Sequence, residues 1–334
     1  MQVCEGLANF DPPARGCVVT IGNFDGVHLG HRLLVETARR RATDWGVPVV
    51  VATFDPHPLA VVAPHHAPPR LTTLPERLAL LERLGVDAAI VLRSRPALLE
   101  QSARQFLVEL AEACRPRAIV EGPTFTFGRR REGTVETLRA YAARHGYEVV
   151  IVEELHTGDT ARRPAINSSA IRAALRAGDV RLANEMLGRP YRIVGTVVAG
   201  DQRGRTIGFP TANLDHVPHL LPREAVYAAA AQLDNDELHL AAVNIGPQPT
   251  FEQPRPRVEA HLLGWSGELA GRRIGLHLLR ALREQRCFAN ADDLVTQLRH
   301  DVEHTRRFAA EVEALRGEPP VPLAGRVPDG SGDG

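Results

Sequence analysis

Lysine is absent from the sequence, because all 40 basic residues among its 334 are arginine. This absence excludes chemistry that needs a lysine amine, namely a Schiff base, the attachment of pyridoxal phosphate, and the lysine of a P-loop. A phosphate clamp in this protein therefore has to use arginine, histidine or backbone N–H groups.

Excess charge, long apolar runs and paired cysteines are also missing. The 40 basic residues balance 40 Asp and Glu, so neither nucleic acid nor an anionic membrane is an expected partner. No apolar run approaches the roughly 18 residues of a membrane helix, and the N-terminus lacks a basic-then-apolar signal pattern. The four cysteines, which form no C-x-x-C pair, are Cys4, Cys17, Cys114 and Cys287. We therefore expect a reduced, cytoplasmic protein.

The first half of the chain alternates apolar strands with helical patterns. Strands are predicted at 17–22, 47–54, 86–92, 116–122 and 147–155. Helices are predicted at 31–46, 74–85, 102–114 and 134–146. This order favours an α/β domain, a Rossmann-like parallel sheet with helices on both faces.

The second half has shorter patterns after a helical stretch at 168–188. Strands separated by Gly, Pro and Asp turns are predicted at 192–200, 225–233, 239–246, 257–265 and 272–282. Such spacing favours a small antiparallel barrel or sandwich. An amphipathic helix is predicted at 291–315, followed by a Gly/Pro-rich, disordered tail. The predicted domains are 1–185 and 186–316, with the tail at 317–334.

The first chemical motif is GNFDGVHLGH at 22–31, which connects the first predicted strand to a helix. Tight turns and close backbone approach to a ligand are allowed by three glycines: Gly22, Gly26 and Gly30. His28 and His31 are three residues apart, so they project to one side of a helix start that attracts anions. Two imidazoles there can neutralise charge on a phosphate under in-line attack. The motif favours nucleotide chemistry, and an ordinary glycine-rich turn is the alternative.

The second motif is VVAGDQRGRTIGFPTANL at 197–214. Its glycines, which can present N–H groups to phosphates, are Gly200, Gly204 and Gly208. Thr211 and Asn213 project to the same side of an extended segment. Two neutral oxygens suit a Mg²⁺ ion that keeps most of its water and also binds substrate phosphate. A surface polar pair on a strand is the alternative.

GNFDGVHLGH resembles the HxGH motif of nucleotidylyltransferases, in the form used by the bacterial bifunctional riboflavin kinase/FAD synthetase family. Three further segments resemble the first module of that family: TFDPHP at 53–58, GPTFTFGRRREG at 122–133 and INSSAIR at 166–172. The resemblance implies adenylyl transfer, in which FMN and ATP give FAD and pyrophosphate.

The same resemblance implies site residues for adenylyl transfer. The residues that would bind and stabilise phosphates during catalysis are His28, His31 and Arg172. The residues that would bind ATP are Gly22, Asn23, Phe24, Asp25, Gly26, Gly30, Ser168 and Ser169. The residues that would bind flavin are Phe54, Pro56, His57, Pro58, Thr124 and Phe127.

The segment from residue 187 to 214 resembles the opening of the riboflavin kinase module, and VNIGPQPTF at 243–251 and VEAHLL at 258–263 resemble later parts of it. This implies transfer of the ATP γ-phosphoryl group to the ribityl 5′-hydroxyl of riboflavin. Thr211 and Asn213 would ligate Mg²⁺, and Glu259 would be the general base. The residues that would bind ATP in this module are Gly200, Gly204, Arg205, Gly208, Phe209 and Pro210. A solubility charge on an edge strand is the alternative for Glu259.

The resemblance implies a nucleotidylyltransferase-like α/β domain followed by a small antiparallel β-barrel of the riboflavin kinase type with a C-terminal helix. The sequence departs from the family pattern at Thr124, Asn167, Ser169, Ala225, Gln285 and Cys287. We expect a bifunctional enzyme that makes FMN and then FAD, with riboflavin, FMN, FAD and ATP as ligands. Two alternatives stay open: a riboflavin kinase with a degenerate adenylyltransferase module, and a flavin- or nucleotide-binding regulator without turnover.

Overall fold

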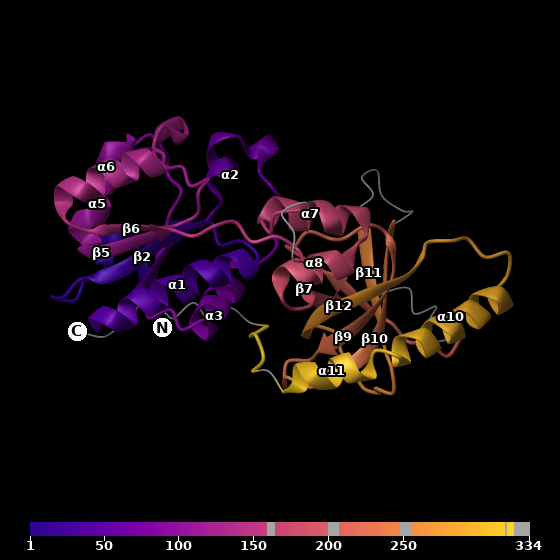
Figure 1. Cartoon of the computed structure of the whole chain (residues 1–334). Helices are drawn as coiled ribbons and strands as arrows, with labels where there is room; N and C mark the ends of the chain where they lie inside the picture. Colours follow the sequence, from indigo (N-terminus) through magenta and orange to yellow (C-terminus); the bar gives the residue numbers. More distant parts are fainter. Residues whose placement is uncertain (159–163, 200–206, 248–255, 318, 324–334) are drawn as a thin grey trace. The chain divides into compact units, whose positions relative to one another are not determined.

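The computed structural model describes residues 1–158, 164–199, 207–247, 256–317 and 319–323. The chain divides into two compact units, Met1–Ile166 and Asn167–Gly325. Figure 1 shows both units and labels many of their helices and strands.

The first unit is built on a six-stranded parallel sheet with the strand order β1-β4-β3-β2-β5-β6. Its strands are β1 (Gln2–Glu5), β2 (Cys17–Gly22), β3 (Val49–Phe54), β4 (Ala88–Leu92), β5 (Pro116–Glu121) and β6 (Glu148–Ile151). The central strands are apolar at almost every position and buried on both faces, as expected for a parallel sheet. The predicted fold class of this half is therefore confirmed.

Helices cover both faces of this sheet. They are α1 (Leu29–Trp45), α2 (Pro58–Val62), α3 (Leu74–Arg83), α4 (Pro96–Leu99), α5 (Ala103–Cys114) and α6 (Val135–His145), with 3₁₀ turns η1 (Leu7–Asn9), η2 (Pro64–His66) and η3 (Arg129–Arg131). Ala38 and Ala42 of α1 pack against Val18 and Val49 on one face. Helices α5 and α6 pack on the other face, in the cluster that contains Ile21.

The strand order creates a switch point between β2 and β5. From β2 the chain adds β3 and β4 on one side, and it then crosses to add β5 and β6 on the other. In open α/β sheets, ligands bind beyond the carboxyl ends of the strands at such a point. The motif at residues 22–31 follows β2 directly, so the fold places it at this edge.

The second unit is a closed antiparallel barrel with the strand order β10-β11-β8-β7-β12-β9. Its strands are β7 (Tyr191–Val198), β8 (Ala212–Asp215), β9 (Ala225–Gln232), β10 (Leu238–Pro247), β11 (Pro256–Leu262) and β12 (Arg273–Glu284). Its helices are α7 (Ser168–Ala177), α8 (Val180–Leu187), α10 (Ala291–Arg306) and α11 (Ala309–Arg316). The predicted small antiparallel barrel is thus confirmed, and the sandwich alternative is wrong.

Helices α7 and α8 belong to the barrel unit. Asn184 of α8 donates to the carbonyl of Leu278 on β12 at 2.8 Å and accepts from the N–H of Tyr191 on β7 at 2.7 Å. The compact units therefore divide before these helices, whereas the sequence analysis places the domain boundary after them.

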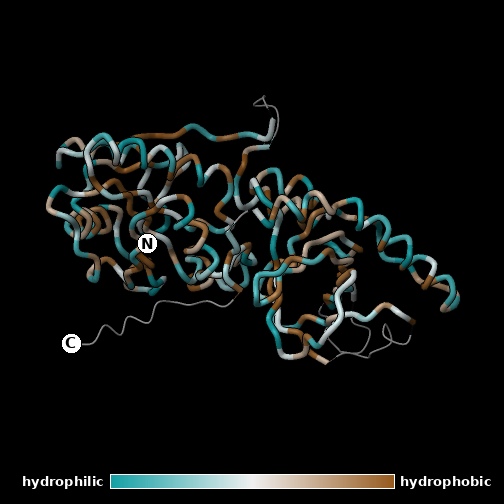
Figure 2. The backbone as a smooth tube through the Cα atoms, turned by 90° about the horizontal axis from the view of Figure 1, so that it is seen from below, coloured by the Kyte–Doolittle hydropathy of each residue, from teal (hydrophilic) through white to brown (hydrophobic). Residues whose placement is uncertain are grey.

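In Figure 2, brown hydrophobic stretches lie along the barrel strands and teal hydrophilic stretches along α10. Helices α7 and α8 also contribute buried apolar side chains, such as Ile171 and Met186. All residues of β9 are buried, and five of its eight are alanine. Small side chains let the elements that pack on the faces of this strand approach closely. Within the described residues, no helix combines the length and hydrophobicity needed to cross a membrane.

The C-terminal part differs from the prediction in two ways. The single helix expected at 291–315 is interrupted at Phe308, where the chain turns so that Phe308 and Val312 pack against Leu238 and Leu279. Part of the tail expected to be disordered is ordered, because Val321 is buried and its carbonyl accepts from Arg192 at 2.5 Å. Burial of apolar side chains explains both differences.

Candidate functional sites

The loop between β2 and α1 holds its two histidines against each other. His28 is the N-cap of α1, and its Nδ1 accepts a hydrogen bond from the N–H of His31 at 3.3 Å. The helix therefore begins at Leu29, two residues earlier than predicted. The two imidazole rings stack with centroids 3.6 Å apart. Because Nδ1 of His28 accepts, the proton of the neutral ring lies on Nε2.

Asp25 anchors this loop to the segment that precedes α3. Its buried carboxylate accepts from the backbone N–H groups of Leu71 at 3.1 Å and Thr72 at 2.9 Å, and from the Thr72 hydroxyl at 3.1 Å. The Thr72 hydroxyl in turn accepts from the N–H of Gly26 at 3.0 Å. Phe24, next to Asp25, is fully buried with its backbone in the left-handed region. Asp25 and Phe24 thus shape the loop from inside the protein.

Gly30 lies in close packing at the start of α1. A Cβ atom at this position would lie 3.1 Å from the carbonyl oxygen of Ile166 and 3.2 Å from Nδ1 of His28. Both contacts are tighter than ordinary van der Waals distance, so a side chain here would press on the His28 ring and on the Ile166 carbonyl, which would have to shift by a few tenths of an ångström. The structure therefore gives the third motif glycine a specific role beside the histidine pair.

The segment after β3 is tied to the same loop by hydrogen bonds. The side-chain amide of Asn23 lies 3.2 Å from Nε2 of His57, and the Thr53 hydroxyl donates to the Asn23 carbonyl at 3.1 Å. The buried Arg77 of α3 donates to the Phe54 carbonyl at 2.8 Å and to the Thr53 hydroxyl at 3.2 Å. Burial lowers the pKa of Arg77, although the carboxylates of Asp25 and Asp55 oppose this effect.

Two further flavin-side candidates, Pro56 and Pro58, lie in this segment. Pro58 begins helix α2, and the carbonyl of Pro56 accepts from the Ser94 hydroxyl at 2.6 Å. The predicted residues Asn23, Phe54, Pro56, His57 and Pro58 are therefore brought together at the carboxyl ends of β2 and β3. Arg77, which supports them, was missed because nothing in its local sequence distinguishes it from a surface arginine.

Glu121, which no sequence pattern indicates as a functional residue, lies at the switch point. Backbone pairing of β2 with β5 runs from Cys17↔Pro116 to Val19↔Ile119. Beyond it, the Glu121 carboxylate accepts from the N–H of Ile21 at 2.6 Å. Burial raises the pKa of Glu121 well above its ordinary value. The Glu121 side chain thus connects β5 to β2 at the residue just before the motif at 22–31.

The two flavin-side candidates in the loop after β5, Thr124 and Phe127, lie in different environments. Thr124 is exposed, whereas the Phe127 side chain is 7% exposed and stacks on Phe125 with ring centroids 5.3 Å apart. A Cβ atom on Gly133 would lie 2.7 Å from the Phe127 ring, so glycine is needed there. Phe127 therefore supports the loop from the core, and the partly buried Phe125 is the aromatic ring nearer the surface.

The residues of the serine motif lie on α7, in the barrel unit. Asn167 is the N-cap, and its side-chain oxygen accepts from the N–H of Ala170 at 2.8 Å. Ser168 and Ser169 form the first turn of the helix, and Arg172 follows one turn later as a buried residue. The departure at Asn167 thus leaves a good helix cap in place of the hydroxyl expected there.

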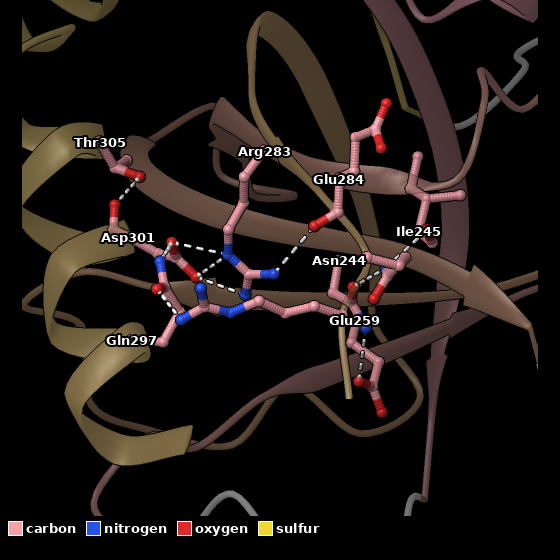
Figure 3. Close-up of polar contacts among 10 residues, drawn as sticks. Asn244, Ile245, Glu259, Arg283, Glu284, Gln297, Asp301 and Thr305 are labelled. Carbon is pink, nitrogen blue, oxygen red and sulfur yellow. Dashed lines mark hydrogen bonds and ion pairs between the residues drawn. The ribbon is translucent and has the colours of Figure 1, made fainter. Parts of the chain in front are cut away.

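The kinase candidates form a row across three adjacent strands of the barrel. Strand pairing places Glu259 of β11 opposite Asn213 of β8 on one side and opposite Asn244 of β10 on the other. Nδ2 of Asn244 donates to Oε2 of Glu259 at 3.4 Å, a contact that Figure 3 shows. Glu259 has neighbours on both sides, so the alternative of an edge-strand solubility charge is wrong.

Arg257 joins the two proposed functional side chains. Its Nε donates to Oδ1 of Asn213 at 2.8 Å and lies 3.2 Å from Oε1 of Glu259. A cation therefore lies against an amide oxygen and a carboxylate oxygen at once. This pair of oxygens attracts positive charge, and amide and carboxylate oxygens are ligands that fit a hard cation such as Mg²⁺.

The PTAN segment supplies the remaining kinase candidates. Thr211 is exposed immediately before β8, and the buried Asn213 lies within that strand. Nδ1 of His261 is 2.8 Å from the carbonyl oxygen of Pro210, and the His261 ring meets Phe209 edge to face at 5.4 Å. Gly208 has a left-handed backbone (φ 85°) that favours glycine. The predicted residues Gly200, Gly204 and Arg205 lie outside the described residues.

The kinase candidates were also compared with the usual clusters of metal-ligating side chains. Within the described ranges, no group of three or more His, Cys, Asp or Glu side chains could hold a metal ion. Mg²⁺ bound through one or two protein oxygens and substrate phosphates needs no such cluster.

Comparison with known families assigns a domain to each unit. A model described as FAD synthetase matches residues 11–163, and a model described as riboflavin kinase matches residues 187–309. The two matches support a chain that carries both modules over the alternative of a kinase with a degenerate first module.

Curated relatives match along nearly the whole chain. Proteins named bifunctional riboflavin kinase/FMN adenylyltransferase from Haemophilus influenzae and Escherichia coli K12 are 35% and 36% identical to it, each over 92% of this chain and 99% and 98% of the relative. The protein of that name from Bacillus subtilis is 35% identical over 87% of this chain and 92% of the relative.

A solved structure shares the architecture of both units. The crystal structure of a macrolide-efflux protein from Streptococcus pneumoniae has a TM-score of 0.83 and 30% sequence identity, and the match covers 91% of this chain and 98% of that chain.

Proposed function

Because the chain belongs to the family of bifunctional riboflavin kinases/FMN adenylyltransferases, we propose that it performs two successive reactions on one vitamin. The kinase phosphorylates riboflavin with ATP and releases FMN and ADP. The adenylyltransferase joins FMN to the AMP part of a second ATP and releases FAD and pyrophosphate. The observation that carries the proposal is that the FAD synthetase model matches residues 11–163, whereas the riboflavin kinase model matches residues 187–309.

In adenylyl transfer, a phosphate oxygen of FMN attacks the α-phosphorus of ATP, and the bond from that phosphorus to the β-phosphate oxygen breaks. Negative charge builds on the α-phosphate and on the departing pyrophosphate. We assign His28 and His31 to binding and stabilising these phosphates, His28 through its Nε2–H, because Nδ1 is used in capping the helix. The N-terminus of α1 adds its own positive field.

The other adenylyltransferase assignments remain proposals. Gly22, Gly26 and Gly30 let the backbone approach ATP, and Asn23, Phe24 and Asp25 fix the shape of that loop. Phe54, Pro56, His57, Pro58, Thr124 and Phe127 are assigned to the flavin side. Ser168, Ser169 and Arg172 are assigned to phosphate binding, and the functional boundary is therefore proposed after residue 185.

In the kinase reaction, the 5′-hydroxyl oxygen of riboflavin attacks the γ-phosphorus of ATP, and ADP leaves. Glu259 accepts the hydroxyl proton as general base. Thr211 and Asn213 would hold Mg²⁺, which when bound neutralises charge on the phosphates. Gly200, Gly204, Arg205, Gly208, Phe209 and Pro210 are assigned to ATP. The donors beside Glu259 are the amide of Asn244 and the guanidinium of Arg257.

Two substitutions test whether the reactions use separate sites. Glu259→Ala should abolish FMN formation from riboflavin and leave the conversion of supplied FMN to FAD intact, and His28→Ala should do the reverse. The exposed residues Glu268 and His145 provide matched controls, and their alanine variants should keep both activities. Loss of both activities from either folded site variant contradicts the two-site assignment.

A further inference from the structure

A chain of amide side chains extends from Glu259 to the end of β12. Asn244 contacts the Glu259 carboxylate at 3.4 Å, and Gln285, the residue after β12, donates to Oδ1 of Asn244. Strand pairing explains the approach, because Ala225 of β9 lies opposite both Ile245 and Glu284. Residues far apart in the sequence are thereby brought beside the proposed base.

The hydrogen-bond partners of Gln285 determine how Asn244 is oriented. Nε2 of Gln285 also donates to the Ile245 carbonyl at 3.0 Å, and a carbonyl can only accept. The amide nitrogen of Gln285 therefore faces β10, so Asn244 has to meet it with its oxygen. The amide nitrogen of Asn244 is then directed at Glu259. Asn244 acts toward this carboxylate only as a donor.

The surroundings hold Gln285 in this position. A Cβ atom on Gly246 would lie 2.9 Å from Nε2 of Gln285, so the absence of a side chain there makes room for it. The end of β12 is fixed by Arg283, which makes three hydrogen bonds to the buried Asp301 of α10 and one to the Glu284 carbonyl (Figure 3). Contacts with β10, β12 and α10 thus fix the orientation of the Asn244 amide that donates to Glu259.

The two oxygens of the carboxylate are held by different groups. Arg257 contacts Oε1 and also binds Asn213, and Asn244 contacts Oε2. Without Asn244, the carboxylate would be held on one side only and would be free to rotate toward Arg257. A base has to be within hydrogen-bond reach of the proton it accepts, so this rotation bears directly on the reaction.

We propose that Asn244 is a positioning residue of the kinase, which holds the Glu259 carboxylate in the orientation that accepts the 5′-hydroxyl proton. This inference rests on the proposed function of Glu259. Asn244 touches no substrate in this role, and it acts through the carboxylate alone. Its effect should therefore fall on the chemical step and leave substrate binding unchanged.

The test is a set of Asn244 variants of the full chain, assayed for FMN formation. Asn244→Ala should lower kcat about 10-fold, the effect of losing one charge-assisted hydrogen bond, with KM for riboflavin and ATP within about 2-fold of wild type. Asn244→Asp keeps the shape without the donor and should lose at least as much, whereas Asn244→Ser keeps a donor and should recover part of kcat. Adenylylation of supplied FMN should not change in any of them.

A double-mutant cycle separates positioning from general structural support. Adding Asn244→Ala to Glu259→Gln should produce no further loss of the residual kinase activity, because the group being positioned is already gone. A loss equal to that seen with Glu259 present overturns the inference, as does a kcat within 2-fold of wild type in Asn244→Ala alone. Wild-type protein that forms no FMN would instead refute the proposed function, and the inference with it.

Discussion

Replacing Asp25 with alanine tests how the first unit holds its motif in place. The substitution leaves the buried N–H groups of Leu71 and Thr72 without their acceptor. Each unpaired donor costs about 1–3 kcal/mol, so the free energy of unfolding should fall by about 2–6 kcal/mol. In a domain of this size, each kcal/mol lowers Tm by about 2–4 °C, which gives a decrease on the order of 10 °C.

The assay can be directed at this unit, because the only two tryptophans are Trp45 in the first unit and Trp265 in the second. In a Trp265→Phe background, fluorescence during heating reports the unit that contains Asp25. Asp44→Ala, an exposed residue of α1, is the matched control and should change stability by no more than about 0.5 kcal/mol.

Asp25→Ala should also lose the conversion of FMN to FAD while keeping FMN formation, because only the first unit contains the disturbed loop. A Tm within 3 °C of the parent protein, or an unchanged rate of FAD formation, would refute the reasoning.

Three further predictions concern both units. Burial raises the pKa of Glu121, so the carboxyl group keeps its proton to higher pH in the folded state than in the unfolded chain. The stability that Glu121 contributes therefore falls as the pH rises above the pKa of an ordinary glutamate. Glu121→Gln has no carboxyl group to ionise, so its free energy of unfolding, measured with urea, should rise relative to that of wild type between pH 5 and pH 8. A difference in free energy of unfolding that stays constant with pH would contradict the raised pKa of Glu121. Gly30→Ala, which pushes on the His28 ring, should slow FAD formation about 10-fold without changing FMN formation, and equal slowing of both would argue against a local effect. Asp301→Ala leaves Arg283 without its buried partner and should destabilise the barrel by about 3–5 kcal/mol, measured through Trp265 in a Trp45→Phe background; a change below 1 kcal/mol would show that the pair contributes little.

Much of the first unit could be predicted because each of its main strands is a continuous apolar run next to a helical pattern. Strand β1 was missed, since QVCE has a single fully buried residue, Cys4, and joins the sheet only at its edge. The interruption of the last helix was also missed. It depends on apolar partners, Leu238 and Leu279, that no periodicity within 291–315 reveals.

The residues of the candidate sites also fall into a group that the sequence could indicate and a group that it could not. Residues within local motifs, such as His28 with His31 and Thr211 with Asn213, could be singled out from the sequence as candidates, and the family resemblance implied their roles. Arg77, Glu121 and Asn244 could not, because each acts through a partner that only the fold brings close: the Phe54 carbonyl, the N–H of Ile21 and the Glu259 carboxylate. Strand register decides the contacts of Glu121 and Asn244, and the packing of helix α3 decides the contact of Arg77. One sequence specifies neither at that distance.

The most direct test follows the products formed when the purified protein is incubated with riboflavin, ATP and Mg²⁺. Chromatography over time should show FMN rising first and FAD replacing it, with one ADP released for each FMN and one pyrophosphate for each FAD. Riboflavin that stays unmodified, or FMN that accumulates without ever becoming FAD, would contradict an enzyme with two working sites.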